Sequence, residues 1–214
     1  MPIIANNYKN IIFDLGGVLI NINYSLTSKA FSELGLSNFD ELFSKAHQTK
    51  LFDFYEKGII SSDEFRNRVK TLLNIPIDDT AIDTAWNAML LDFPIERLQF
   101  LKKIKTTNRT FLLSNTNDIH IRKINCELQR EYGIADLSGY FEKTYLSYKV
   151  HLRKPDAEIF ELVLSENGLE PSETLFIDDS SQHIEGAQKL GIHTYWLDTK
   201  KETVLDLFPK SETY

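Results

Sequence analysis

Short, wholly apolar runs recur along the chain, separated by longer segments with apolar residues at helical spacing. The first run, 11–13, consists of Ile, Ile and Phe. A strand with no polar side is typical of a parallel sheet covered on both faces. Because such runs alternate with helical segments, the pattern predicts an α/β fold with a doubly wound parallel sheet in three layers. The predicted strands are 11–13, 110–113, 143–147, 174–177 and 194–197, and the predicted helices are 95–104, 121–131, 155–166 and 182–190.

Residues 25–93 have a different predicted secondary structure, because helix-forming segments follow one another there with no strand between them. Gly35 and Gly58 end two of these segments. The pattern predicts an all-helical insertion after the first strand, preceded by a short extended flap at 19–24. We therefore predict an α/β core of residues 1–22 and 94–214 and a helical domain of residues 23–93. The predicted helices of the insertion are 28–34, 39–47, 51–57, 62–73 and 79–91.

Polar residues follow three of the predicted strands at the point where each strand ends. Asp14 follows the first strand, Ser114 follows the second, and Asp178 and Asp179 follow the strand 174–177. The carboxyl ends of parallel strands meet at one edge of a sheet, where open α/β sheets bind their ligands. We therefore expect these side chains to share one crevice.

Three carboxylates in one crevice repel one another unless a cation lies among them or they take up protons. Oxygen ligands favour a hard cation, and Mg²⁺ usually binds through one or two carboxylates, water and a substrate phosphate. Ser114 and Asn115 lie at a predicted helix N-terminus, where an anion is favoured, and Lys154 adds a positive charge for a phosphate. Each feature alone is more often a helix cap, a turn or, for Arg153 and Lys154, an exposed basic pair. Their combination favours a magnesium and phosphate site.

The composition narrows the range of partners. The 31 acidic and 24 basic residues give a net charge of -7, which argues against nucleic acid or an anionic membrane as a partner. The single cysteine, Cys126, excludes an internal disulfide and a cysteine-only metal site, and we expect it to be a bystander. No run resembles a signal peptide or reaches membrane-spanning length, so we expect a cytoplasmic protein. The sequence does not indicate the oligomeric state.

Four segments together resemble the motifs of the haloacid dehalogenase-like (HAD) hydrolase superfamily. In chain order they are 14–18 (Asp-Leu-Gly-Gly-Val), 113–117 (Leu-Ser-Asn-Thr-Asn), 153–155 (Arg-Lys-Pro) and 176–179 (Phe-Ile-Asp-Asp). The resemblance covers nearly the whole chain. It implies a Rossmann-like core with the helical insertion as a type 1 cap. Within the superfamily, these segments and 184–187 (Ile-Glu-Gly-Ala) are similar to the bacterial alpha-glucose-1-phosphate phosphatase branch.

The resemblance implies a Mg²⁺-dependent phosphatase for a small phosphate ester, such as the sugar phosphate glucose 1-phosphate, that acts through an aspartyl-phosphate on Asp14. Ser114 and the backbone of Asn115 are expected to bind the phosphoryl group, and Lys154 to neutralise both that group and Asp14. The implied ligands of Mg²⁺ are Asp14, the backbone carbonyl of Gly16, Asp179 and, directly or through water, Asp178.

One position departs from the family pattern. Most phosphatases of the family carry a second Asp, two residues after the nucleophile, as general acid and base, whereas this chain has Gly16 there. General acid–base help contributes about 100- to 10,000-fold to a rate. A good leaving group such as an anomeric oxygen needs less help; otherwise a cap residue or water supplies the proton. We predict that Asn23, His47 or His120 lies near the leaving group. The other histidines are expected to be structural: His151, His183 and His193.

Substrate choice is expected to depend on the cap. Phe52 and Tyr55 either face a sugar there or, as aromatic residues more often do, pack in the interior. Trp86 is expected to pack within the cap, and the end of 82–91 to form a hinge with Pro94.

Two alternatives stay open. A 2-haloacid dehalogenase uses the same Asp nucleophile, but it needs no metal and requires an arginine that residues 15–28 lack. A non-catalytic binding protein of the same fold is the other alternative, and it accounts for Gly16.

Overall fold

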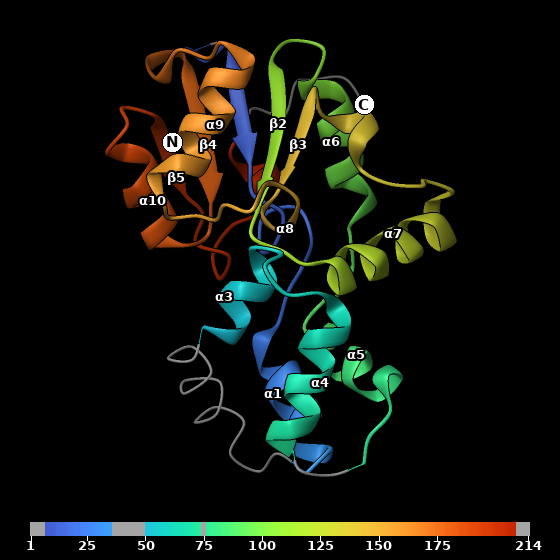
Figure 1. The fold of residues 1–214 in the computed structure, drawn as a ribbon. Helices are drawn as coiled ribbons and strands as arrows, with labels where there is room; N and C mark the ends of the chain where they lie inside the picture. The colour runs from blue at the N-terminus through green and yellow to red at the C-terminus, as the bar shows by residue number, and fades with distance from the viewer. Residues whose placement is uncertain (1–6, 36–49, 74–75, 209–214) are drawn as a thin grey trace.

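The computed structural model describes residues 7–35, 50–73 and 76–208. Within these ranges, five parallel strands form one sheet in the order β3-β2-β1-β4-β5 (Figure 1). The first strand is therefore central, and its carboxyl end lies between those of β2 and β4. The strands are β1 (Asn10–Phe13), β2 (Arg109–Ser114), β3 (Lys143–Leu146), β4 (Thr174–Asp178) and β5 (His193–Trp196).

Each face of the sheet has its own apolar core, because successive side chains of a strand point to opposite faces. Ile11 and Phe13 pack in one core with residues of α6 and α7, and Ile12 packs in the other with residues of α9 and α10. The predicted three-layer α/β fold is confirmed. The helices and short turns of this part are α6 (Ile95–Ile104), α7 (Asp118–Tyr132), η2 (Ser138–Tyr140), α8 (Ser147–Val150), α9 (Ala157–Asn167), η3 (Pro171–Glu173), α10 (Ser181–Gln188) and η4 (Val204–Asp206).

A helical insertion follows β1, as predicted. Its helices pack around Trp86, whose ring stacks on Phe52 at a centroid distance of 5.2 Å and lies 5.1 Å from Phe65. In Figure 1 the insertion lies beyond the carboxyl ends of the strands, with α3 next to α8. The described helices of the insertion are α1 (Tyr24–Glu33), α3 (Leu51–Glu56), α4 (Ser62–Leu73) and α5 (Asp79–Asn87).

Two predicted boundaries in the insertion are wrong. The helix α1 begins at Tyr24 instead of residue 28, because the side chain of Asn23 accepts a hydrogen bond from the backbone N–H of Ser25 at 3.1 Å and caps the helix. The extended flap therefore ends before residue 24. The helix α5 ends at Asn87 instead of residue 91. The predicted helix 39–47 lies outside the described residues, and the domain boundaries at 22/23 and 93/94 stay a prediction.

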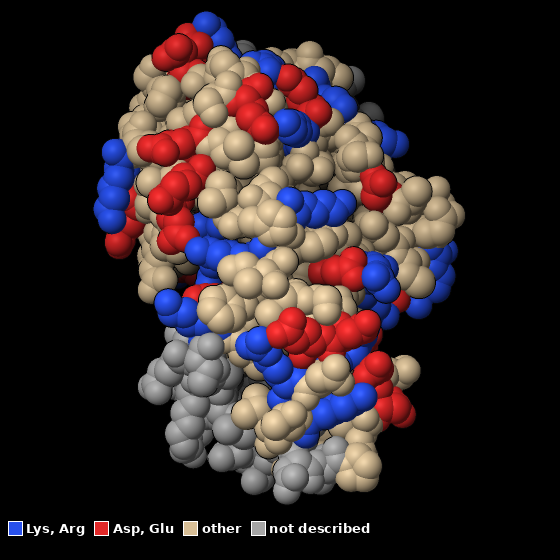
Figure 2. Space-filling model, in the orientation of Figure 1, with Lys and Arg blue, Asp and Glu red and all other residues tan. Residues whose placement is uncertain are grey.

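Charge is mixed on the surface that Figure 2 shows. Lysine and arginine side chains alternate there with aspartate and glutamate, and neither sign covers the face alone. Across the described ranges, every helix is too short or too polar to cross a membrane.

Candidate active site

The carboxyl ends of β1 and β4 bring three carboxylates together. Asp14 directly follows β1, Asp178 is the last residue of β4, and Asp179 follows it. One carboxylate oxygen from each lies within 4.8 Å of the others. Asp14 and Asp178 are buried, and Asp179 is partly buried. The structure thus brings together the three carboxylates that the sequence placed at strand ends.

Lys154 is completely buried among these carboxylates. Its Nζ donates hydrogen bonds to Asp14 Oδ1 at 2.7 Å, to Asp178 Oδ2 at 2.6 Å and to the backbone carbonyl of Leu113 at 2.9 Å. Asn115 fixes its backbone, because the Lys154 N–H donates to Asn115 Oδ1 at 2.9 Å and Asn115 Nδ2 donates to the Lys154 carbonyl at 2.8 Å. The ammonium is therefore held in one place between the ends of three strands.

The negative charge of the three carboxylates is not balanced by the protein's own positive charge at this site. Burial raises the pKa of Asp14 to about 7, with Asp178 and Asp179 adding to the rise and Lys154 opposing it. Burial and the charge of Asp178 likewise raise the pKa of Asp179 to about 6. Burial also acts to raise the pKa of Asp178, but Lys154 and a histidine hold it below its ordinary value. Three carboxylates against one ammonium leave excess negative charge, which a divalent cation with oxygen ligands offsets. The donor set therefore fits Mg²⁺.

The turn after β1 approaches this cluster closely. Gly17 has φ +74°, a conformation that favours glycine, and a Cβ built on it would lie 2.3 Å from Asp179 Oδ2. A Cβ built on the neighbouring Gly16 would meet the side chain of Ile22, 3.3 Å from its Cδ1. The assignment of the Gly16 carbonyl as a metal ligand stays a prediction.

The loop after β2 carries the residues predicted to bind phosphate. Ser114 is buried at the end of β2. Farther along, Asn117 caps α7 by accepting a hydrogen bond from the His120 N–H at 3.0 Å. Between them, the N–H of Thr116 donates to Ser147 Oγ at 2.9 Å. The loop is therefore held from both sides at a helix N-terminus, and the phosphate-binding role of Ser114 and Asn115 stays a prediction.

His183 belongs to the site although the sequence analysis expected it to be structural. Its Nδ1 lies 3.0 Å from each oxygen of Asp178, and its ring also approaches Asn115 Nδ2 at 3.5 Å. His183 thus links two residues that hold Lys154. The sequence indicates this role only weakly, because its one sign is a histidine in the first turn of the helix that follows the paired aspartates.

The predicted acid–base residues do not lie free at the crevice. His120 is buried, stacks on Trp86 at 5.1 Å, and places Nε2 3.2 Å from the Trp86 carbonyl and Nδ1 3.1 Å from Asn117 Nδ2. Burial lowers its pKa to about 4, so it is neutral near pH 7. Asn23 uses its side chain to cap α1. His47 lies outside the described residues.

Both candidate sugar-facing aromatic residues are packed in the interior. Phe52 is 9% exposed and Tyr55 is 2% exposed, and both belong to the apolar cluster of the insertion. Tyr55 stacks on Phe65 at 4.3 Å, and its hydroxyl accepts a hydrogen bond from the Ile119 N–H at 3.3 Å. These two aromatic rings therefore stabilise the insertion.

Arg153 and Lys154 are not an exposed basic pair. Arg153 is partly buried and forms ion pairs with Asp53 and with Glu56 of α3, the latter at 3.2 Å. It therefore joins the loop that carries Lys154 to the helical insertion. No pattern in the sequence indicates this pairing, because about 100 residues separate the partners along the chain.

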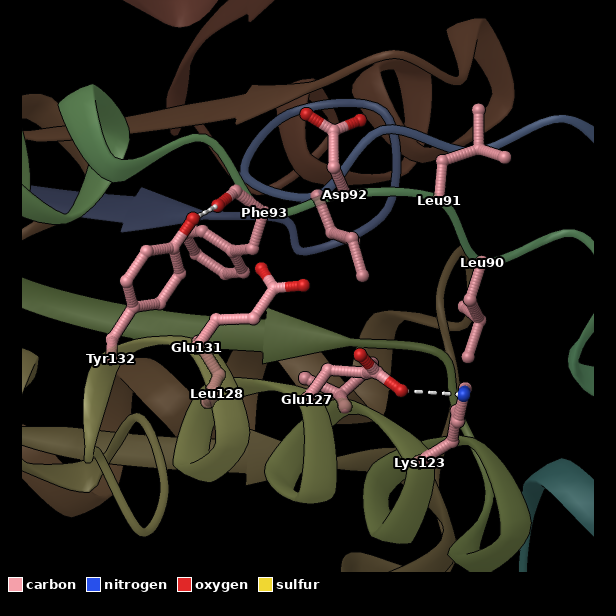
Figure 3. Close-up of a pocket in the computed structure, with 11 residues that line it drawn as sticks. Leu90, Leu91, Asp92, Phe93, Lys123, Glu127, Leu128, Glu131 and Tyr132 are labelled. Carbon is pink, nitrogen blue, oxygen red and sulfur yellow. Dashed lines mark hydrogen bonds and ion pairs between the residues drawn. The ribbon is translucent and has the colours of Figure 1, made fainter.

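A separate cavity of about 30 Å³ lies where the insertion returns to the sheet (Figure 3). Leu90 and Phe93 of the returning segment border it, together with Lys123, Glu127 and Tyr132 of α7. The Tyr132 hydroxyl donates to the Phe93 carbonyl at 2.8 Å, and Lys123 pairs with Glu127 at 2.6 Å. A space of this size holds about one water, so it does not bind a phosphate ester. The hydrogen bond from Tyr132 instead joins α7 to Phe93, next to the predicted hinge at Pro94, and the hinge stays a prediction.

Comparison with known proteins agrees with this geometry. The model of the family described as haloacid dehalogenase-like hydrolase matches residues 8–191. The chain is 34% identical over 187 residues to D-ribitol-5-phosphate phosphatase of Bacteroides thetaiotaomicron. That match covers 87% of this chain and 90% of the relative.

Solved structures show the same similarity. The HAD family enzyme BT-2542 of Bacteroides thetaiotaomicron, in complex with magnesium and inorganic phosphate, has a TM-score of 0.84 at 38% identity, over 91% of this chain and 96% of that chain. The L-2-haloacid dehalogenase RSc1362 has a TM-score of 0.61 at 21% identity, over 94% and 92% of the two chains. At that identity the likeness concerns the fold alone.

Proposed function

The chain belongs to the haloacid dehalogenase-like hydrolase family, and we propose that its substrate is the phosphate ester of a small polyol or sugar. At the coarser level it is a Mg²⁺-dependent phosphatase that acts on a small phosphate ester. The similarity to a D-ribitol-5-phosphate phosphatase at 34% identity supports the finer assignment. We therefore place D-ribitol 5-phosphate ahead of glucose 1-phosphate, which the sequence motifs favoured.

We assign the nucleophilic role to Asp14. Its carboxylate attacks phosphorus, the bond from phosphorus to the leaving oxygen breaks, and water then hydrolyses the aspartyl-phosphate and restores the carboxylate. Lys154 orients Asp14 through the 2.7 Å hydrogen bond, and its positive charge favours the ionised form of Asp14 beside the negative phosphate. This buried bridge from Lys154 to both Asp14 and Asp178 is the observation that carries the assignment.

The other proposed roles concern charge and position, which supply most of the catalysis in phosphoryl transfer. When bound, Mg²⁺ supplies positive charge at the phosphoryl oxygens, and its proposed ligands are Asp14, Asp178, Asp179 and the carbonyl of Gly16. Ser114 and the backbone of Asn115 bind the transferred phosphoryl group. His183 orients Asp178 from the opposite side.

The substrate assignment is tested with a panel of D-ribitol 5-phosphate, glucose 1-phosphate and glucose 6-phosphate, with Mg²⁺ and again with EDTA. We expect EDTA-sensitive phosphate release with the highest kcat/KM for ribitol 5-phosphate. A preference for glucose 1-phosphate would instead support the branch suggested by the motifs. Phosphate release from none of these esters would contradict a sugar or polyol substrate.

The dehalogenase alternative has lost support. Its structural relative is only 21% identical, and residues 15–28 contain no arginine for a substrate carboxylate. A chloride-release assay with 2-chloropropionate checks it, and we expect no release.

A further inference from the structure

The group that replaces the missing acid must face the site from the insertion. In phosphoryl transfer the attacking and leaving oxygens are roughly in line on opposite sides of phosphorus. Asp14 attacks from the end of β1, so the leaving oxygen points away from the sheet, toward the helical insertion beyond the strand ends (Figure 1). Gly16 has no side chain to donate a proton, and His120 is buried with both ring nitrogens engaged.

The C-terminal end of α3 is fixed against the segment between β3 and α9. Gly58 has φ +63°, and a Cβ on it would lie only 2.1 Å from the carbonyl oxygen of Tyr148, so the two backbones are in close contact. His151 Nδ1 lies 2.8 Å from the carbonyl oxygen of Lys57. Glu56 is the last residue of α3, so these contacts hold its backbone next to the segment that follows β3.

Glu56 lies at the border between the insertion and the catalytic lysine. Its Oε2 is 3.2 Å from Arg153 Nη2, and its side chain is 24% exposed. The positive charge of Lys154 acts on the pKa of Glu56. Glu56 is therefore within electrostatic reach of the same crevice as the nucleophile.

We propose that the Glu56 carboxyl is the general acid and base that replaces the side chain missing at position 16, an inference that rests on the proposed phosphatase function. In the first step, Glu56 gives its proton to the leaving oxygen as the electron pair of the phosphorus–oxygen bond moves to that oxygen and Asp14 bonds to phosphorus. In the second step, the Glu56 carboxylate takes a proton from water while the water oxygen bonds to phosphorus. The bond from Asp14 to phosphorus then breaks, and inorganic phosphate leaves.

The surroundings of Glu56 suit both steps. Burial raises its pKa to about 7, against the positive charge of Lys154. The other charged or titratable groups that face it are Arg153, Asp53 on its own helix, and Tyr24 of α1. Arg153 favours the carboxylate, whereas the negative phosphate of a substrate favours the protonated acid. A pKa near neutrality lets one group donate and then accept a proton.

The test compares two leaving groups in Glu56→Gln. An alkyl phosphate such as glucose 6-phosphate or ribitol 5-phosphate needs a proton on its leaving oxygen, whereas the phenolate of 4-nitrophenyl phosphate leaves without one. We expect kcat/KM for the alkyl ester to fall by about 100-fold or more, and that for 4-nitrophenyl phosphate to change by less than about 10-fold. An equal fall for both substrates, or no fall for either, would overturn the proposal.

Asp53→Asn is the matched control, because it removes the other carboxylate that pairs with Arg153 and leaves the proposed acid in place. We expect Asp53→Asn to change kcat/KM for both esters by the same small factor. If it reproduces the leaving-group dependence of Glu56→Gln, the effect belongs to the position of Arg153 and the proposal fails.

A second measurement tests the role of Glu56 in the second step, the hydrolysis of the aspartyl-phosphate. Without the base, hydrolysis of the aspartyl-phosphate is slowed, so Glu56→Gln is expected to release a burst of about one equivalent of 4-nitrophenolate before a slow steady state. If Glu56→Gln shows no burst and its turnover of the alkyl ester is unchanged, the role of Glu56 is contradicted and the phosphatase function is not. Absence of any turnover in the wild-type protein contradicts the phosphatase function itself, so the two failures are distinguishable.

Discussion

Gly17 and Lys154 are the single residues on which the geometry of the crevice most depends. Gly17 lets the turn after β1 pass beside Asp179, and Lys154 joins Asp14 to Asp178. The sequence indicated the three aspartates because each follows an apolar run whose end is defined by its position in a parallel sheet. It did not indicate the role of His183, because a single histidine on a helix has no pattern that separates a partner of a carboxylate from a surface residue.

Gly17→Ala is expected to weaken magnesium binding. The added Cβ would lie 2.3 Å from Asp179 Oδ2 and displace that carboxylate. We expect the Mg²⁺ concentration for half-maximal activity to rise by about 10-fold or more, since displaced ligands typically cost 10- to 100-fold in metal affinity. Titration of activity with Mg²⁺ measures the change.

Gly133→Ala is the control, because Gly133 has φ +69° and its added Cβ has no neighbour within 4 Å. Gly133→Ala introduces about 1–2 kcal/mol of backbone strain, as Gly17→Ala does. We expect no change in the Mg²⁺ concentration for half-maximal activity. Equal magnesium dependence in the two variants would show that the contact with Asp179 does not matter.

At the scale of elements, the site depends on how α3 docks on the segment that follows β3. The sequence predicted both α3 and the strand, because their apolar periodicity is local. It did not predict the pairing of Arg153 with Asp53 and Glu56, which arises only when distant segments pack together. The start of α1 is a different case, because it depends on a local cap by Asn23 that the predicted boundary did not take into account. The interior packing of Phe52 and Tyr55 agrees with the more common of the two alternatives that the sequence left open.

Gly58→Ala is expected to displace α3 and lower activity while the sheet stays folded. Its Cβ would meet the Tyr148 carbonyl oxygen at 2.1 Å, and backbone cannot move aside as a flexible side chain does. We expect kcat/KM for the preferred ester to fall by about 10-fold or more, because misplacing a catalytic group by about 1 Å costs about 100-fold. Steady-state kinetics and far-UV circular dichroism measure the two effects.

Gly168→Ala is the matched substitution, with φ +59° and no neighbour within 4 Å of the added Cβ. It is expected to lower the melting temperature by about 2–8 °C, as about 1–2 kcal/mol of backbone strain predicts for a chain of this size, and to leave kcat/KM unchanged. Unchanged kcat/KM in Gly58→Ala as well would contradict the importance of this contact.

For the whole molecule, three carboxyl groups at or near the site have pKa values above those of free side chains. Burial raises the pKa of Asp14 and of Glu56 to about 7 and that of Asp179 to about 6. Because these values lie above the ordinary values of 3.8 for Asp and 4.5 for Glu, these three groups bind more protons in the folded protein than in the unfolded chain between about pH 4 and 7. Their contribution to stability is complete below that window and is lost as the pH rises through it.

We therefore expect the metal-free protein, kept in EDTA, to gain stability from this site as the pH falls from 8 to 5. Added Mg²⁺ is expected to raise the melting temperature more at pH 8 than at pH 5, because protonated carboxyls bind cations poorly. Thermal unfolding at both pH values, with EDTA and with Mg²⁺, measures this difference. A larger effect of Mg²⁺ at pH 5 would contradict the assigned pKa directions.

The proposed phosphatase mechanism depends on Asp14 as the nucleophile, and Asp14→Asn tests this role most directly. Phosphate release with Mg²⁺ is measured for the wild type, for Asp14→Asn and for Asp136→Asn, a control at an exposed position outside the crevice. We predict that Asp14→Asn lowers kcat by at least about 1,000-fold while Asp136→Asn retains full activity. An Asp14→Asn protein that releases phosphate at the wild-type rate would contradict the account.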